Sequence, residues 1–144
     1  MTQPVLDLSP LRSAIASLDA ALVAVGNEAW FSAQSPAIQN TVIAGVIQNF
    51  EFVYELSVKM LRRELERGSD SPASIDAANF RDVLRMGAER GLIEDVEAWF
   101  HYRQMRNLSA HTYDQAKAWQ VFHDLPPFLK DAKAVLARLE ARNG

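Results

Sequence analysis

The sequence predicts an all-α protein, a bundle of four to five helices. Apolar residues recur every three or four positions along nearly the whole chain, the spacing that builds one apolar face of a helix. No segment alternates apolar and polar residues as a half-buried strand does, and no Asn-Gly or Asp-Gly pair joins two such segments. Ser-Pro pairs precede three of the periodic segments, and this pair is a common helix start.

Composition indicates one globular domain over residues 1–144, with 49% hydrophobic and 23% charged residues. The absence of cysteine excludes disulfide frameworks, thiolate nucleophiles and cysteine zinc sites. A net charge of -3 argues against a protein that binds nucleic acid over most of its surface, although it allows a local basic pocket. The first residues do not resemble a signal peptide, and no apolar run approaches the roughly 20 residues that span a bilayer. We therefore expect a soluble, cytoplasmic protein without membrane association.

The first predicted helix begins at Ser9-Pro10 and ends at Gly26. The second begins at Ser35-Pro36 and runs to Gly68, about 32 residues or ~48 Å. Its apolar residues form two stripes: Val42, Val46, Phe50, Val53 and Met60 in the first, and Ile43, Ile47, Tyr54, Val58, Leu61 and Leu65 in the second. One stripe can face the domain's own core. The second predicts a homodimer, unless the bundle itself covers this helix on both sides.

Three further helical segments follow. A short, weaker one runs from Ser71-Pro72 to Gly91, and the next begins with the acidic pair Glu94 and Asp95. The last is capped by Asp114 and continues to about residue 139. Pro126-Pro127 interrupts this last segment, so we expect a kink there or a split into two helices.

The sequence contains few of the residue patterns that are typical of catalytic sites. The histidines are His101, His111 and His123, without an HExxH pattern or an acidic cluster at metal-ligand spacing. A glycine-rich phosphate loop is also missing. We therefore expect neither a metal nor a cofactor.

The segment from Arg106 to Asp114 concentrates the polar groups suited to chemistry. Arg106 suits a phosphate because its planar guanidinium can bind two oxygens, and the His111 imidazole suits proton transfer near neutral pH. In an unbroken helix Asn107 and His111 share a face, so the amide could orient the imidazole. The alternative is an interhelical corner held by hydrogen bonds, with Tyr113 half-buried.

RNLSAHTY, residues 106–113, resembles the Arg-x4-His-x-Tyr motif of the HEPN superfamily. The branch it most resembles is the nucleotidyltransferase substrate-binding proteins, which includes HepT-type toxins. FEFVYELSVKMLRREL, residues 50–65, is similar to this family's Phe-Glu-aromatic-Glu-Leu helix. The Gly91-Leu92-Ile93 turn, Trp99 and the PPFL segment at residues 126–129 occur in the family's order, so the resemblance covers most of the chain.

The resemblance implies an antiparallel up-and-down helical bundle, and a homodimer that brings two Arg-x4-His motifs to one cleft. It also implies a partner, a small MNT-type nucleotidyltransferase encoded next to this protein. As a toxin, the protein would cleave RNA without a metal: His111 as general base, Arg106 stabilising charge on the phosphate and Asn107 orienting the imidazole. The partner would neutralise it by attaching AMP to Tyr113. Alternatively, the chain is a non-catalytic subunit in which Arg106 and Tyr113 bind a nucleotide or substrate.

Glu55 and Lys59 lie four residues apart on the long helix, in the favourable order for an ion pair. HEPN proteins often carry such a pair near the cleft. The resemblance therefore implies that both residues belong to the substrate- or nucleotide-binding site and that Glu55 positions Arg106. The alternative is a pair that faces solvent.

Overall fold

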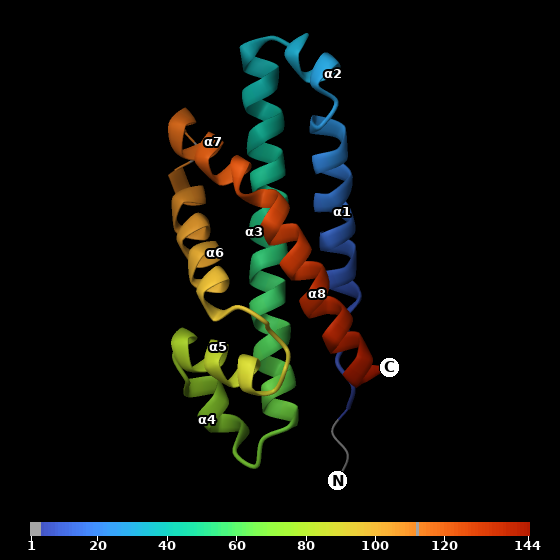
Figure 1. The fold of residues 1–144 in the computed structure, drawn as a ribbon, viewed down its shortest axis with the longest axis vertical. Coiled ribbons are helices and arrows are strands. Elements are labelled where there is room, and N and C mark those ends of the chain that lie inside the picture. Colours follow the sequence, from blue (N-terminus) through green and yellow to red (C-terminus); the bar gives the residue numbers. More distant parts are fainter. Residues whose placement is uncertain (1–3, 112) are drawn as a thin grey trace.

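The computed structural model describes residues 4–111 and 113–144, and this part of the chain contains helices and connecting loops but no strand (Figure 1). The four longest helices are α1 (Ser9–Val25), α3 (Pro36–Arg67), α6 (Val96–Leu108) and α8 (Leu125–Asn143). The shorter ones are α2 (Glu28–Ser32), α4 (Pro72–Ala77), α5 (Phe80–Glu89), α7 (Gln115–His123) and the 3-10 helix η1 (Ser109–His111). The predicted all-α class is confirmed. Within the described ranges, no helix is long and apolar enough to cross a membrane.

Helix α3 is the central helix of the bundle. It packs against α1, α4, α5, α7 and α8. Figure 1 shows the four long helices running in alternating directions, with the start of α1 and the end of α8 at the same end of the bundle. The side chain of Asn143 in the last turn of α8 accepts a hydrogen bond of 2.9 Å from the Leu6 backbone N–H. The predicted antiparallel up-and-down bundle is therefore confirmed.

The predicted helix starts are correct in place but differ in chemistry. Ser35 caps α3 as expected, because its hydroxyl accepts a 3.2 Å hydrogen bond from the Ile38 N–H. Ser9 lies inside the first turn of α1, and its hydroxyl donates instead to Asp7, at 2.6 Å. Ser71 makes no side-chain cap bond. Proline in the first turn is thus the feature that these three helices share.

The structure contains more helices than the predicted four to five, for three local reasons. Asn27 caps the five-residue helix α2, a segment that the apolar spacing did not predict. Asn79 caps α5 by accepting from the Asp82 N–H at 2.9 Å, which divides the predicted segment of residues 72–91. The last segment splits rather than kinks: Asp124 ends α7, and Pro126 lies in the first turn of α8, where its missing N–H costs nothing.

The bundle itself covers both apolar stripes of α3. Nine of their eleven members are buried within one chain; Val42 and Val58 are partly buried. The reasoning that the second stripe requires another subunit is therefore wrong, because α1 and α8 and the α4–α7 segment pack on different sides of α3. The exposed large apolar residue in the middle of α3 is Phe52, which belongs to neither stripe.

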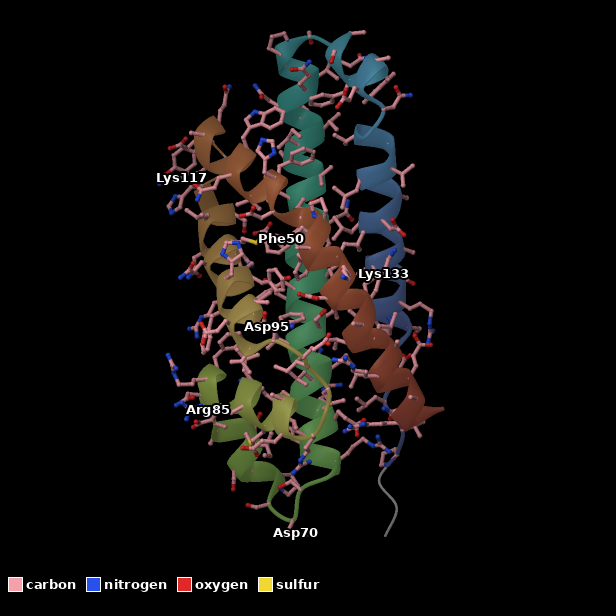
Figure 2. The ribbon with its side chains drawn as sticks, in the orientation of Figure 1. Phe50, Asp70, Arg85, Asp95, Lys117 and Lys133 are labelled. Atoms are coloured by element: carbon pink, nitrogen blue, oxygen red, sulfur yellow. The ribbon has the colours of Figure 1, made fainter. Side chains whose placement is uncertain are left out.

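An aromatic cluster joins α3, α6 and α8 in the interior. The Phe128 ring of α8 lies edge-on to Phe50 of α3, at 4.8 Å between centroids, and to Tyr102 of α6, at 5.0 Å. Figure 2 shows Phe50 among these helices. Edge-to-face packing of buried rings fixes the position of α6 on α3. It thereby positions the polar end of α6 described next.

Candidate functional site

Arg106, in the last turn of α6, reaches across to α3 and contacts two carboxylates there. Its Nη1 lies 2.6 Å from Glu51 Oε2. Its Nη2 and Nε donate to the same Glu55 oxygen, Oε1, at 2.8 and 3.2 Å. Glu51 and Glu55 are one helical turn apart on α3, so they hold the guanidinium from two sides. The expectation that Glu55 positions Arg106 agrees with this geometry.

Ser109 completes this cluster from the 3-10 helix η1. Its buried hydroxyl lies 2.8 Å from Glu51 Oε2 and 2.7 Å from the Arg106 backbone carbonyl, both of which can accept its proton. The hydroxyl oxygen accepts from Arg106 Nη1 at 3.2 Å. Glu51 and Ser109 therefore fix the end of α6 and the start of η1 against α3.

The carboxylates stabilise the charged form of Arg106. The hydrogen bonds that Arg106 donates to Glu55 are the largest cause that raises the pKa of Arg106, partial burial opposes the increase, and the charge of Glu51 adds to it. The guanidinium side chain stays 30% exposed, so solvent and ligands can reach it. The result is a permanently charged, oriented donor at the surface of the bundle.

His111 and Tyr113 lie beside each other just after this cluster. His111 Nδ1 is 3.0 Å from the Tyr113 hydroxyl, and the two rings are edge-on at 5.7 Å between centroids. When Nδ1 carries the ring proton and donates it to Tyr113, Nε2 has a free lone pair and can accept a proton. Tyr113 is 82% exposed, so the half-buried ring expected for the alternative, an interhelical corner, is wrong.

Asn107 does not orient His111 as the unbroken-helix argument predicted. Helix α6 ends at Leu108, and residues 109–111 form the tighter 3-10 helix, in which the four-residue spacing no longer places side chains on one face. Among the residues that the structure describes, the exposed Asn107 side chain makes no hydrogen bond, and the contact of Nδ1 is Tyr113. Asp114 acts as the predicted cap, accepting from the Ala116 N–H at 3.0 Å and the Lys117 N–H at 3.3 Å.

Lys59 is not paired with Glu55 in the part of the chain that the structure describes, so the predicted ion pair between them is wrong. Glu55 pairs with Arg106 instead, because the guanidinium supplies two donors to a single carboxylate oxygen. The exposed Lys59 lines a hollow of about 520 Å³ between α3 and α4.

Two members of the site, Glu51 and Ser109, were not predicted. Glu51 precedes Glu55 by four residues, a spacing that places both carboxylates on one face of α3 and could have identified it. Ser109 carries no comparable signal, because its contact depends on where α6 ends. Within residues 4–111 and 113–144, no group of three or more His, Asp or Glu side chains is arranged to hold a metal ion.

Comparison with known proteins agrees with this architecture. The family model described as nucleotidyltransferase substrate binding protein like matches residues 6–141. A Haemophilus influenzae protein named "Probable ribonuclease HepT" is 43% identical over 138 residues, which cover 96% of this chain and 94% of that protein.

A solved structure from Haemophilus influenzae shares the fold. It is described as the fold of a substrate binding domain of a nucleotidyltransferase, and it superposes with a TM-score of 0.91 at 42% identity. The match covers 93% of this chain and 99% of that one. On the family match and this relatedness, the chain belongs to the family of nucleotidyltransferase substrate-binding-like proteins.

Proposed function

We propose that this chain is an endoribonuclease of the HEPN type that cleaves RNA without a metal ion. The observation that carries the proposal is the corner between α3, α6 and η1, where Glu51 and Glu55 orient the Arg106 guanidinium and the His111 imidazole follows at the surface. The name of the Haemophilus influenzae relative supports the same activity.

RNA supplies its own nucleophile, the ribose 2′-hydroxyl. His111 Nε2 takes the proton of this hydroxyl, and the oxygen attacks the adjacent phosphorus. The bond from phosphorus to the 5′-oxygen of the next nucleotide breaks, which leaves a 2′,3′-cyclic phosphate and a 5′-hydroxyl. Arg106 stabilises the negative charge that develops on the phosphate oxygens. The exposed Asn107 amide is available to hydrogen-bond the RNA.

A homodimer would supply the acid that protonates the leaving 5′-oxygen, from the second copy of the site. We propose that the copies meet along the outer face of α3 that carries Phe52. This residue is 51% exposed and lies between Glu51 and Glu55 in sequence, next to the carboxylates that hold Arg106. Burial of such an apolar ring favours association.

A small MNT-type nucleotidyltransferase would regulate the enzyme by modifying Tyr113. The Tyr113 oxygen attacks the α-phosphorus of ATP, the bond to the bridging oxygen of the β-phosphate breaks, pyrophosphate leaves, and the phenol proton passes to solvent. The exposure of Tyr113 makes its oxygen accessible to a second protein. The new phosphodiester anion would lie where the oxygen now contacts His111 Nδ1, and the attached nucleoside would keep RNA from the site sterically.

The second candidate is a non-catalytic subunit that presents a nucleotide or another substrate to the nucleotidyltransferase. The description of the similar structure as a substrate binding domain favours it. Arg106 and Tyr113 would then bind phosphate and base, and Glu55 and Lys59 would flank the ligand.

The deciding experiment compares RNA cleavage by the wild-type chain and by His111→Ala, with metal ions chelated. We expect wild type to produce 2′,3′-cyclic phosphate ends and His111→Ala to be slower by about 10²- to 10⁴-fold, the usual contribution of a general base. His123→Ala, which changes an exposed histidine of α7, is the matched control. Nucleotide binding without any cleavage by wild type would support the second candidate instead.

A further inference from the structure

A hollow of about 240 Å³ lies next to Tyr113, between α3 and α7. Its walls come from the N-terminal part of α3, through Asn40 and Ala44, and from α7, through Gln115 and Trp119. Figure 1 shows α7 beside this half of α3. Tyr113 itself lines the hollow, so a group attached to this residue would have immediate access to it.

Three polar groups in the walls have no hydrogen-bond partner among the residues that the structure describes. The amides of Asn40 and Gln115 and the indole N–H of Trp119 make no hydrogen bond within residues 4–111 and 113–144. An amide offers a donor and an acceptor side by side, the pattern that pairs with the amino group and ring nitrogen of adenine. The polar groups of the hollow therefore match the edge of a purine base.

The remaining walls suit the flat faces of such a base. Ile43 and Ala118 are buried and form an apolar base to the hollow. The Trp119 ring is held edge-on by Phe31 at 6.1 Å and by Phe122 at 5.5 Å between centroids. A fixed aromatic ring is a common surface against which nucleobases stack.

We propose that this hollow binds the adenine ring of the AMP that is attached to Tyr113, an inference that rests on the proposed modification of this residue. The volume is below the roughly 300 Å³ of pockets that enclose a whole ligand, so it suits the base alone, with ribose and phosphate outside. A short covalent tether gives an effective concentration of about millimolar, so even a weak base site would be occupied after modification. The bound adenine would hold the phosphodiester beside His111.

Saturation-transfer NMR on the full, unmodified chain tests the site with AMP as the probe and ribose 5-phosphate as the probe without a base. We expect saturation of the adenine protons of AMP and no signal from ribose 5-phosphate. Ala44→Phe, which fills the hollow from an exposed position of α3, should reduce the AMP signal at least fivefold. Asn40→Leu, which replaces the amide with an apolar group of similar size, should weaken AMP binding severalfold.

Ala16→Phe is the matched control, because it makes the same change at an exposed position of α1 outside the hollow. An AMP signal unchanged by Ala44→Phe, or no adenine signal at about 10 mM AMP, would overturn the proposal. An increase in the KM for RNA in Ala44→Phe but not in Ala16→Phe would overturn it as well, because the hollow would then serve the substrate. Failure of the proposed modification is a separate result: intact-mass spectrometry would then show no adenylyl group on wild type after incubation with the nucleotidyltransferase and ATP, whether or not free AMP binds in the hollow.

Discussion

One carboxylate oxygen of Glu55 on α3 accepts two hydrogen bonds from the Arg106 guanidinium on α6, at 2.8 and 3.2 Å. This contact joins residues 51 positions apart in sequence and leaves the Arg106 side chain partly exposed. Glu51 contacts the other side of the guanidinium. The two glutamates differ in burial, and this difference gives the first prediction.

Glu51→Ala should destabilise the fold more than Glu55→Ala. Glu51 is the less exposed carboxylate and contacts both Arg106 and the buried Ser109 hydroxyl, so its loss should lower the free energy of unfolding by about 1–3 kcal/mol. Glu55 is 55% exposed, and its loss should cost about 0–1 kcal/mol. Urea denaturation followed by circular dichroism measures both. Equal losses would mean that Ser109 does not depend on Glu51.

Arg106→Ala and His111→Ala should be strongly non-additive in RNA cleavage. Both side chains are proposed to act on one transition state, so the double variant should be little slower than the slower single variant. The test measures the cleavage rates of wild type, the two single variants and the double variant on one RNA substrate. Circular dichroism confirms that each chain is folded. Full additivity of the two free-energy changes would show that they act in separate steps.

Tyr113→Phe should separate cleavage from neutralisation. The substitution removes the acceptor oxygen and the contact with His111 but retains the exposed ring, so the free energy of unfolding should change by about 0.5 kcal/mol or less. We expect most of the RNA cleavage to remain. Intact-mass spectrometry after incubation with the nucleotidyltransferase and ATP should show an adenylyl group on wild type only. The same addition on both chains would exclude Tyr113 as the acceptor.

Tyr102 should make the fold sensitive to alkaline pH. Burial is the main cause that raises the pKa of Tyr102, and the hydrogen bond that it donates to Asp131 adds to the effect. Above the unfolded pKa of about 10, the unfolded chain loses this proton while the folded chain keeps it. The stability from this group is therefore present below about pH 10 and decreases as the pH rises further. The decrease in free energy of unfolding between pH 8 and about 10.5 should be smaller in Tyr102→Phe. An identical decrease in both chains would contradict this.

Phe52→Asp should weaken self-association if α3 forms the proposed dimer face. A charge on this exposed position should raise the dimer dissociation constant by at least about tenfold, which corresponds to 1.4 kcal/mol. Val23→Asp on α1, at a residue that is 72% exposed, is the control for adding a charge at an apolar surface position. Sedimentation equilibrium measures both constants. A wild-type chain that is monomeric at micromolar concentration would remove the proposed shared site.

Several features of the candidate site could be predicted from the sequence because they depend on local chemistry. The guanidinium, imidazole and phenol of Arg106, His111 and Tyr113 occur within eight residues, so they must lie near one another in any fold. The pairing of Glu55 with Arg106 was predicted through a family resemblance, since no local rule connects α3 with α6. Asn107 was placed incorrectly because the argument assumed a continuous helix, whereas Ser109 turns the chain into η1.

The sequence by itself determined the helical class, the length of α3 and the starts of α1, α3, α4, α6 and α7, because apolar spacing, proline and cap residues act over one or two turns. Only the tertiary structure decided which carboxylates pair with Arg106 and how far Tyr113 is exposed. It also decided that a single chain covers both apolar stripes of α3. These properties depend on how distant helices cross, and the crossing is set by packing among rings such as Phe50, Tyr102 and Phe128. Packing of this kind is a property of the whole core, which no single segment of the sequence contains.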